Sequence, residues 1–421
     1  MAFDTAISGI KASTADLNII GNNVANSSTT GFKSSRGEFS DIYATSSLGV
    51  GSESVGKGVR LTDVAQQFEQ GNISLTGSAL DLAINGNGFF VLSDAGAPAY
   101  TRAGNFSLDQ NGFVVDNQGR RLMAFEADPT GLITGAVSEL QISTTLINPA
   151  PTALVDMTLN LDARDTVPTT AWGGPYNAFA SPPTVPSPDM YNNTTSMTIY
   201  DGLGNPHLLS TYYVKTATPN QWQVHTLIDG VTVGGPDTLA FNSNGQFPTA
   251  SLPVQVNIAG WTPLDASGSA NGAAAQAFTV DLSPSTQYGA DFGVLSLAQD
   301  GYPAGQLGGI DVADNGTVEA FFNNGQSLAL GQVVMANFAN TQGLQPIGDT
   351  SWVETFNSGA PLVGAPGSSG LGVIQSGALE DSNVELTEQL VKMIVAQRNF
   401  QANAQVIQTE DAITQTVINL R

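Results

Sequence analysis

Residues 382–421 read SNVELTEQLVKMIVAQRNFQANAQVIQTEDAITQTVINLR, with neither glycine nor proline. Residues seven apart form two interleaved, mostly apolar series: Leu386, Met393, Phe400 and Ile407 in one, Leu390 and Ile418 in the other. A heptad repeat of this kind predicts an α-helix that packs along a seam. Ser382 and Glu385 fit a capping box, so the helix is expected to begin there.

This helix is apolar on more than one side. Further apolar residues widen the face beyond the seam: Val406, Ile413, Val417 and Leu420. A helix with such a wide apolar face should contact more than one neighbour.

The N-terminal stretch, FDTAISGIKASTADLNIIGNNVANS over residues 3–27, has the same period. Its apolar or small residues alternate at three and four: Phe3, Ala6, Ile10, Ser13, Leu17, Ile20, Val24 and Ser27. Gly9 and Gly21 lie inside the pattern, and each costs about 1 kcal/mol relative to alanine. The helix is therefore marginal alone and needs a partner.

Two arrangements satisfy this need. The ends could pair as an antiparallel hairpin within one monomer, or they could pack between subunits. The excess apolar width favours the second. The predicted inter-subunit seam consists of Phe3, Ile10, Leu17, Val24, Leu386, Leu390, Met393, Phe400, Ile407 and Ile418.

Between the ends the period changes to two, which predicts strands. Examples are Met157–Leu161, Ser196–Tyr200, His207–Val214 and Trp222–Ile228. Asn-Gly and Asp-Gly pairs separate many of them and are typical of antiparallel hairpins. The predicted fold is multi-domain, with paired α-helical coiled-coil ends and nested, mainly antiparallel β-domains.

The domain plan follows from these changes in pattern. We expect a terminal helical domain (1–30 and 382–421), a connector region (31–70 and 359–381), an inner β-domain (71–145 and 286–358) and an inserted outer β-domain (146–285).

Composition limits the possible partners. The chain has 421 residues and a net charge of -23, and only 12% of its residues are charged. Between Leu122 and Val391 the only basic residues are Arg164 and Lys215. This acidity argues against nucleic acid or an anionic membrane as a partner. No segment has the roughly 20 apolar residues of a membrane span, so no membrane insertion is expected.

The search for chemistry yields no catalytic, cofactor-binding or metal-binding residues. The only histidines are His207 and His225, both in expected strands, and cysteine is absent. Asn85–Gly88 lacks the lysine of a P-loop, and Asp311–Gly316 lacks the EF-hand spacing. The chain is expected not to be an enzyme and to need no cofactor.

Three groups of residues carry a family resemblance. NNVANSSTTGFK (22–33) resembles the N-terminal signature of bacterial flagellar rod and hook proteins, with Asn23, Ala25, Asn26, Gly31, Phe32 and Lys33 as its motif residues. The run from Gly86 to Gly112 is similar to their shared β-domain motif, and SNVEL (382–386) with MIVAQRNFQAN (393–403) is similar to their C-terminal signature.

The resemblance implies a structural role. Within the family, the inserted segment 146–285 favours a hook subunit over the shorter rod proteins. The implied assembly is a flexible tube, a homopolymer that transmits motor torque to the filament as a universal joint, with the terminal helices lining an export channel. The implied partners are the flagellar rod, hook cap, hook–filament junction proteins and type III export apparatus.

The resemblance also implies a location at the hook, outside the cell. Because the N-terminus lacks the pattern of a signal peptide, export without a cleaved signal is expected. A distal rod protein and a β-rich surface adhesin or layer protein remain as alternatives. A hydrolase in residues 146–285 would require a catalytic constellation that the sequence does not show.

Overall fold

The computed structural model describes residues 2–42, 56–143 and 146–419. The chain divides into two compact units. Unit 1 comprises Met1–Thr144, Gly308–Phe321 and Ser327–Arg421, and unit 2 comprises Thr145–Leu307 and Phe322–Gln326.

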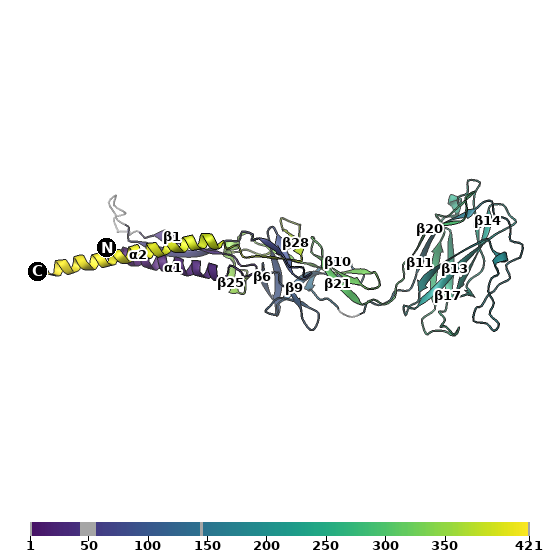
Figure 1. Cartoon of the computed structure of the whole chain (residues 1–421), viewed down its shortest axis with the longest axis horizontal. Helices are drawn as coiled ribbons and strands as arrows, with labels where there is room; N and C mark the ends of the chain where they lie inside the picture. Colours follow the sequence, from purple (N-terminus) through teal and green to yellow (C-terminus); the bar gives the residue numbers. More distant parts are fainter. Residues whose placement is uncertain (1, 43–55, 144–145, 420–421) are drawn as a thin grey trace. The chain divides into compact units, whose positions relative to one another are not determined.

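Unit 1 contains the two helices, α1 (Ala2–Ala25) and α2 (Leu386–Asn419). They lie side by side and antiparallel (Figure 1): a Cβ placed on Gly9 would lie 2.6 Å from Asn403 Oδ1, and Asn23 Nδ2 donates to Gln389 Oε1 at 3.3 Å. The two helices of one chain therefore pack together as an antiparallel hairpin, which is one of the two arrangements expected from the sequence.

The capping box predicted at Ser382 is wrong. The helix begins four residues later, at Leu386, and the Glu385 carbonyl accepts the Gln389 N–H. Ser382 Oγ instead accepts from the Val384 N–H at 3.3 Å, a local turn. The Asn383 side chain accepts the Ser34 N–H and donates to the Gln67 carbonyl, both in the connector before the inner β-domain. These bonds keep the residues around Asn383 extended.

The predicted connector 31–70 contains regular structure. β1 (Ser35–Asp41) and β2 (Val59–Gln66) form an antiparallel hairpin with a bulge between Glu38 and Phe39. The hairpin packs on α1, where the Val59 N–H donates to Ser8 Oγ at 3.2 Å.

The β-part of unit 1 is built around one sheet with the order β21-β22-β23-β9-β5-β6-β26-β25. Its aromatic core places Phe68, Phe89, Tyr100, Phe338 and Trp352 edge to face. The strands of this sheet are β5 (Phe89–Asp94), β6 (Ala97–Thr101), β7 (Ser107–Leu108), β8 (Val114–Val115), β9 (Arg121–Ala127), β10 (Ile133–Glu139), β21 (Leu307–Val312), β22 (Thr317–Phe322), β23 (Ser327–Val333), β24 (Met335–Asn337), β25 (Gln345–Gly348), β26 (Ser351–Val353) and β27 (Leu362–Gly364). A 3₁₀ turn, η3 (Thr341–Gly343), precedes β25.

Two short strand pairs connect the beginning and the end of the chain. β3 (Ile73–Leu75) pairs with β29 (Ala378–Glu380), and β4 (Leu82–Asn85) pairs with β28 (Val373–Ser376), both antiparallel. The region 359–381, expected to be a connector, thus contains β27, β28 and β29 and closes unit 1 just before α2.

Unit 2 is formed by two sheets that share one core. One contains β11 (Leu154–Asp162), β17 (Gln255–Trp261), β18 (Gln276–Asp281), β19 (Thr286–Tyr288) and β20 (Gly293–Gln299), and the other contains β12 (Asn193–Tyr200), β13 (Pro206–Lys215), β14 (Gln221–Ile228), β15 (Val231–Thr232) and β16 (Asp237–Ala240) (Figure 1). Two 3₁₀ turns, η1 (Pro188–Met190) and η2 (Thr249–Ser251), lie in the connections. Alternate residues of β11, namely Val155, Met157, Leu159 and Leu161, are buried between the sheets.

The expected end of the inserted domain at residue 285 is too early. β19 and β20 both pair with β11, so the inserted unit continues to Leu307. Local sequence alone does not show which strand β19 and β20 join.

Candidate assembly site

The family-motif residues, Asn23 to Lys33, lie where α1 ends and the chain turns into β1. Asn23 is 1% exposed and pairs with Ser35 in both directions: its Nδ2 donates to the Ser35 carbonyl (2.8 Å), and its Oδ1 accepts the Ser35 N–H (2.9 Å). With the bond to Gln389, one amide joins α1, β1 and α2. A buried side-chain amide whose N–H groups and oxygen are all hydrogen-bonded fixes the position of its partners, because leaving either the donor or the acceptor unpaired costs free energy.

Gly31 permits the next close approach. Its φ is +69°, and an added Cβ would lie 2.5 Å from the Ala103 backbone nitrogen. Its N–H donates to the Glu380 carbonyl at 2.8 Å. Only glycine combines this conformation with this contact at low cost.

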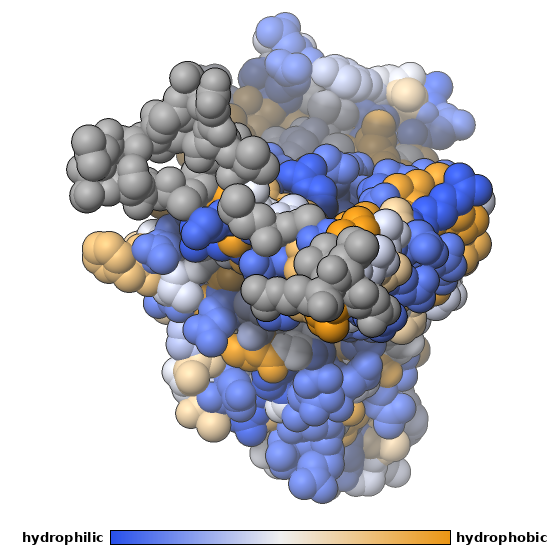
Figure 2. All heavy atoms as spheres, turned by 90° about the vertical axis from the view of Figure 1, so that its left-hand side faces the viewer, coloured by the Kyte–Doolittle hydropathy of each residue, from blue (hydrophilic) through white to orange (hydrophobic). Residues whose placement is uncertain are grey.

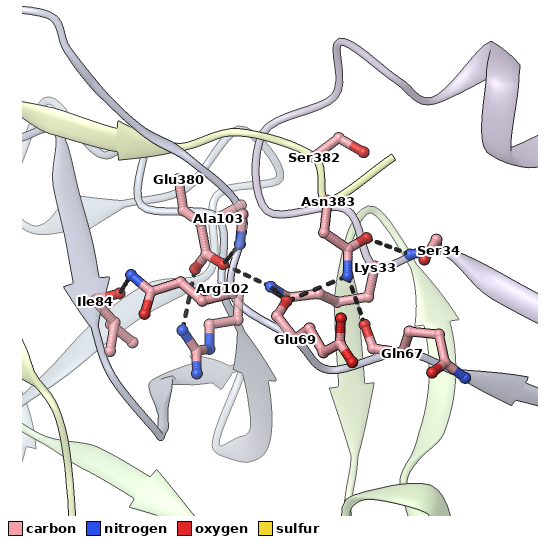
Figure 3. A network of polar contacts seen from close by, with 12 residues as sticks. Lys33, Ser34, Gln67, Glu69, Ile84, Arg102, Ala103, Glu380, Ser382 and Asn383 are labelled. Atoms are coloured by element: carbon pink, nitrogen blue, oxygen red, sulfur yellow. Dashed lines mark hydrogen bonds and ion pairs between the residues drawn. The ribbon is translucent and has the colours of Figure 1, made fainter. Parts of the chain in front are cut away.

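A buried ionic cluster follows Gly31 (Figure 3). Lys33 Nζ donates to Glu380 Oε1 (2.5 Å) and to the Glu69 carbonyl (2.7 Å), while Arg102 Nη1 donates to Glu380 Oε2 (3.1 Å). The side chains of Lys33 and Glu380 are fully buried, and that of Arg102 is 5% exposed. Arg102 also donates to the Gly86 carbonyl at 2.7 Å.

The cluster contains two cations, Lys33 and Arg102, and one carboxylate, Glu380. The buried charges therefore depend on this carboxylate and on hydrogen bonds to backbone carbonyls. Burial lowers the pKa of the Lys33 amine and of the Arg102 guanidinium, and Glu380 acts in the opposite direction on both. The Gly71 N–H is the third donor to this carboxylate and binds Oε1 at 2.9 Å. Removing the carboxylate would leave two unbalanced buried cations.

Asn383 completes the junction from the side of α2. Its Oδ1 accepts the Ser34 N–H (2.7 Å), and its Nδ2 donates to the Gln67 carbonyl (2.8 Å) (Figure 3). Sequence reasoning did not identify Glu380, Asn383 or Arg102 as site residues. Arg102 and Asn383 lie inside segments that carry the family resemblance, and Arg102 is also one of only 13 basic residues in the chain.

The other motif residues have lesser roles. Ala25 is exposed, and Phe32 is half-buried. Asn26 Nδ2 donates to the Asn22 carbonyl (3.0 Å), and Asn26 Oδ1 accepts from Thr29 Oγ1 (3.2 Å), which shapes the turn after α1.

The predicted seam residues are not the buried line of the helix pair. The buried residues of the two helices are Ala6, Ser13, Ile20, Asn23, Gln389 and Ala396. Three of these residues are small, namely Ala6, Ser13 and Ala396, and the side chain of Asn403 lies against Gly9. The seam residues lie beside it: Ile10, Leu17, Val24, Met393 and Ile407 are half-buried, and Phe3, Leu386, Leu390, Phe400 and Ile418 are exposed.

α2 also presents apolar side chains away from α1. Leu390, Val391, Ile394 and Val395 are 49–61% exposed. Seen from the end at which α2 terminates, apolar residues form separate patches among hydrophilic ones (Figure 2). The role of the seam residues between subunits stays a prediction.

The two histidines have structural surroundings in unit 2. His207 Nδ1 lies 2.6 Å from Asp229 Oδ2, and His225 stacks on Trp172 at 4.1 Å between ring centroids. Among the described residues, no group of histidine and acidic side chains could hold a metal ion. Neither described helix is long and apolar enough to cross a bilayer.

Family models match four segments of the chain, including both of its ends. They are described as Flagella basal body rod protein (residues 3–33), Flagellar hook protein FlgE/F/G D1 domain (83–160), Flagellar basal body protein FlaE D2 domain (160–302) and Flagellar basal body rod FlgEFG protein C-terminal (375–420). Together with the paired helical ends, these matches define a protein of the flagellar rod and hook class.

Full-length relatives narrow the class. The chain is 39% identical over 430 residues to the flagellar hook protein FlgE of Escherichia coli (strain K12), and 38% identical over 432 residues to that of Salmonella typhimurium, covering 100% of each chain in both cases. It belongs to the flagellar hook protein family. A crystal structure of the Helicobacter pylori flagellar hook protein FlgE2 shares the fold, with a TM-score of 0.52 at 16% identity over 73% of this chain and 100% of that chain.

Proposed function

We propose that this chain is a structural subunit of the bacterial flagellar hook, polymerising through the exposed apolar faces of α1 and α2. The observation that carries the proposal is the second apolar face of α2: Val391, Ile394 and Val395 are each at least half exposed although α1 already covers another side. Contiguous exposed apolar surface marks an interaction site. Since the family is one of structural flagellar proteins, other copies of the same chain are the natural partners.

The buried junction suits a subunit that transmits force. Lys33, Arg102 and Glu380 join the turn after α1, the inner sheet and the strand before α2 through hydrogen bonds between buried groups. A load on the helices would therefore reach the sheet through several bonds at once. In the proposed tube, stacked helices resist twisting and line an export channel, and the acidic, lysine-poor outer β-units slide past their neighbours as the tube bends.

The proposed location is the hook, outside the cell, after export through the flagellar type III apparatus. The proposed partners beyond the chain itself are the rod, the hook cap and the hook–filament junction proteins. No catalytic step is proposed. The chain acts by assembling.

Immunogold electron microscopy tests the assignment, using antibody raised against unit 2 and cells that produce this chain as their only hook-family protein. Label on a short curved segment between cell body and filament is expected. Label along the whole filament would indicate a filament subunit, and label only after the envelope is opened would indicate a rod protein; either would overturn the proposal.

A further inference from the structure

Phe356 is the most exposed large apolar residue among those described, at 101% of its reference accessibility. It lies at the second position of a turn in which the Ser358 N–H donates to the Thr355 carbonyl at 3.2 Å. An aromatic side chain with no cover in its own chain is a strong candidate for an anchor in an interface.

The turn that carries Phe356 is rigid. Thr355 Oγ1 donates to the Gly343 carbonyl (2.5 Å), and Ser358 Oγ accepts the Thr355 N–H (2.9 Å) and donates to the Thr355 carbonyl (2.8 Å). Ser358 itself is fully buried. Because both flanks of the turn are fixed, docking Phe356 would order little additional chain, which reduces the entropic cost of binding.

A matching cavity of about 450 Å³ lies elsewhere in unit 1, between α1 and the β1–β2 hairpin. Ile7 and Ala12 line it from the helix, and Val59 and Leu61 line it from β2. Leu61 is 38% exposed, so apolar surface is available in the wall. The volume falls in the range of pockets that hold small-molecule ligands, which leaves ample room for one phenylalanine side chain.

The charges at the two surfaces are complementary. Lys11 and Arg60 line the cavity together with a single acid, Asp4, in a chain that has 13 basic and 36 acidic residues. Glu354, two residues before Phe356, is exposed, and one of its carboxylate oxygens accepts from Tyr100 Oη at 2.9 Å. Opposite charges at the cavity and at the turn that carries Glu354 and Phe356 favour one orientation of docking.

We infer that Phe356 of one copy of this chain docks into the cavity between α1 and the β1–β2 hairpin of a second copy, with Glu354 facing Lys11 and Arg60. The exposure of Phe356 shows that it does not fill the cavity of its own chain. Contact between two different surfaces of identical chains is heterologous, and repetition of such a contact builds a helical polymer. The inference rests on the proposed function and adds a specific contact to it.

Engineered disulfides test this contact directly because the chain contains no cysteine. The test variant carries Phe356→Cys and Leu61→Cys. Its polymers are sheared from cells that lack another hook-family protein, oxidised, and run on a non-reducing denaturing gel. A ladder of dimers, trimers and longer chains that collapses on reduction is expected, since each copy would bond to two neighbours.

Matched control variants show whether the ladder depends on the proposed pair of positions. Each single-cysteine variant should yield no species beyond a dimer. A pair of Phe356→Cys with Leu295→Cys, which is 70% exposed in unit 2, should yield no ladder. Intact polymers without a ladder from the test pair, or a ladder from the control pair, would overturn the inference and leave the hook assignment standing. Absence of polymers from the unaltered chain would instead overturn the proposed function.

A charge exchange provides a second readout. Glu354→Arg or Arg60→Glu alone should reduce the number of hooks per cell about tenfold, by placing like charges together. The double variant should restore most of them. Failure of the double variant to recover above either single variant would contradict the predicted pairing.

Discussion

Lys33 Nζ lies 2.5 Å from Glu380 Oε1 although the two residues are 347 positions apart in sequence, and both side chains are fully buried. Glu380 is the last residue of β29, and Lys33 follows the turn that ends α1. The ion pair therefore joins the beginning and the end of the chain at the base of the helix pair. This junction couples the helices to the sheet, which the proposed role in transmitting force requires.

Breaking this ion pair should destabilise unit 1 strongly. Glu380→Gln would leave Lys33 and Arg102 as buried cations without a counterion, and we expect a loss of about 3–5 kcal/mol. Lys33→Met should cost less because Arg102 still balances Glu380. Hydrogen exchange monitored by mass spectrometry would show the loss in peptides of β4 and β5.

The control for this prediction is an ion pair at the surface. Arg36 and Glu38 are paired at 3.2 Å with side chains 65% and 50% exposed. Arg36→Met should change the free energy of unfolding by less than about 1 kcal/mol. Equal effects of Glu380→Gln and Arg36→Met would show that the buried cluster has no special role.

Two glycines of α1 form a matched pair for testing the helix contact. Gly21→Ala should stabilise unit 1 by about 1 kcal/mol, because alanine is the better helix former and nothing lies within 4 Å of the added Cβ. Gly9→Ala should stabilise it less, because the new Cβ would lie 2.6 Å from Asn403 Oδ1 and the Asn403 side chain would have to move. Denaturant unfolding followed by helix circular dichroism would measure both, and equal stabilisation by the two substitutions would contradict the contact between Gly9 and Asn403.

The turn between β25 and β26 contains backbone strain. Asp349 and Thr350 have φ values of 49° and 50°, and β-branched residues such as threonine rarely adopt this conformation. Thr350→Gly should therefore stabilise unit 1 by about 1 kcal/mol. Thr62→Gly, at a position of β2 where φ is not positive, should instead destabilise it, and urea unfolding of the two variants would separate these signs.

Unit 2 should lose stability as the pH falls from about 6.5 to about 4. Burial lowers the pKa of His225 to about 4, so over this range the unfolded chain binds a proton that the folded chain does not. The contribution is fully present above the unfolded pKa near 6.5 and is lost as the pH falls toward the folded value.

The measurement is hydrogen exchange of β13 and β14 peptides across this pH range, corrected for intrinsic rates. One proton gives a slope of at most about 1.4 kcal/mol per pH unit. His225→Phe should flatten the curve while keeping the ring stack on Trp172. Both histidines of the chain lie in unit 2, so unit 1 should lack this component.

Local patterns in the sequence predicted the parts of the fold that depend on local information. The heptads indicated α1 and α2, and alternation placed Met157–Leu161 and Trp222–Ile228 inside β11 and β14. Both patterns reflect the side-chain periods of the element itself. The sequence also indicated, through its glycine content, that α1 needs a partner.

Features that depend on distant pairing were missed. The end of the inserted unit at Leu307 depends on β20 joining β11, and the cluster at Glu380 depends on β29 joining β3. Neither pairing has a local signature, because the partners are far apart in sequence. Whether the predicted seam residues pack between subunits stays a prediction; within one chain, other residues form the buried line of the helix pair, among them Ala6, Ser13 and Ala396.

Leu390 tests whether the exposed side of α2 is the polymer interface. Its side chain is 49% exposed in the single chain, so Leu390→Asp should leave the free energy of unfolding almost unchanged. In the polymer the same aspartate would be buried against apolar neighbours without a counterion, which costs several kcal/mol per subunit. Cells carrying this variant should therefore export the subunit and form no hooks.

Gln405→Asp, at a polar exposed position of the same helix, controls for helix propensity and should assemble normally. Electron microscopy of cells, together with immunoblots of the culture medium, distinguishes failed assembly from failed export. Normal hooks built from Leu390→Asp subunits would exclude this face of α2 from the interface and would direct the search to the opposite side of the helix pair.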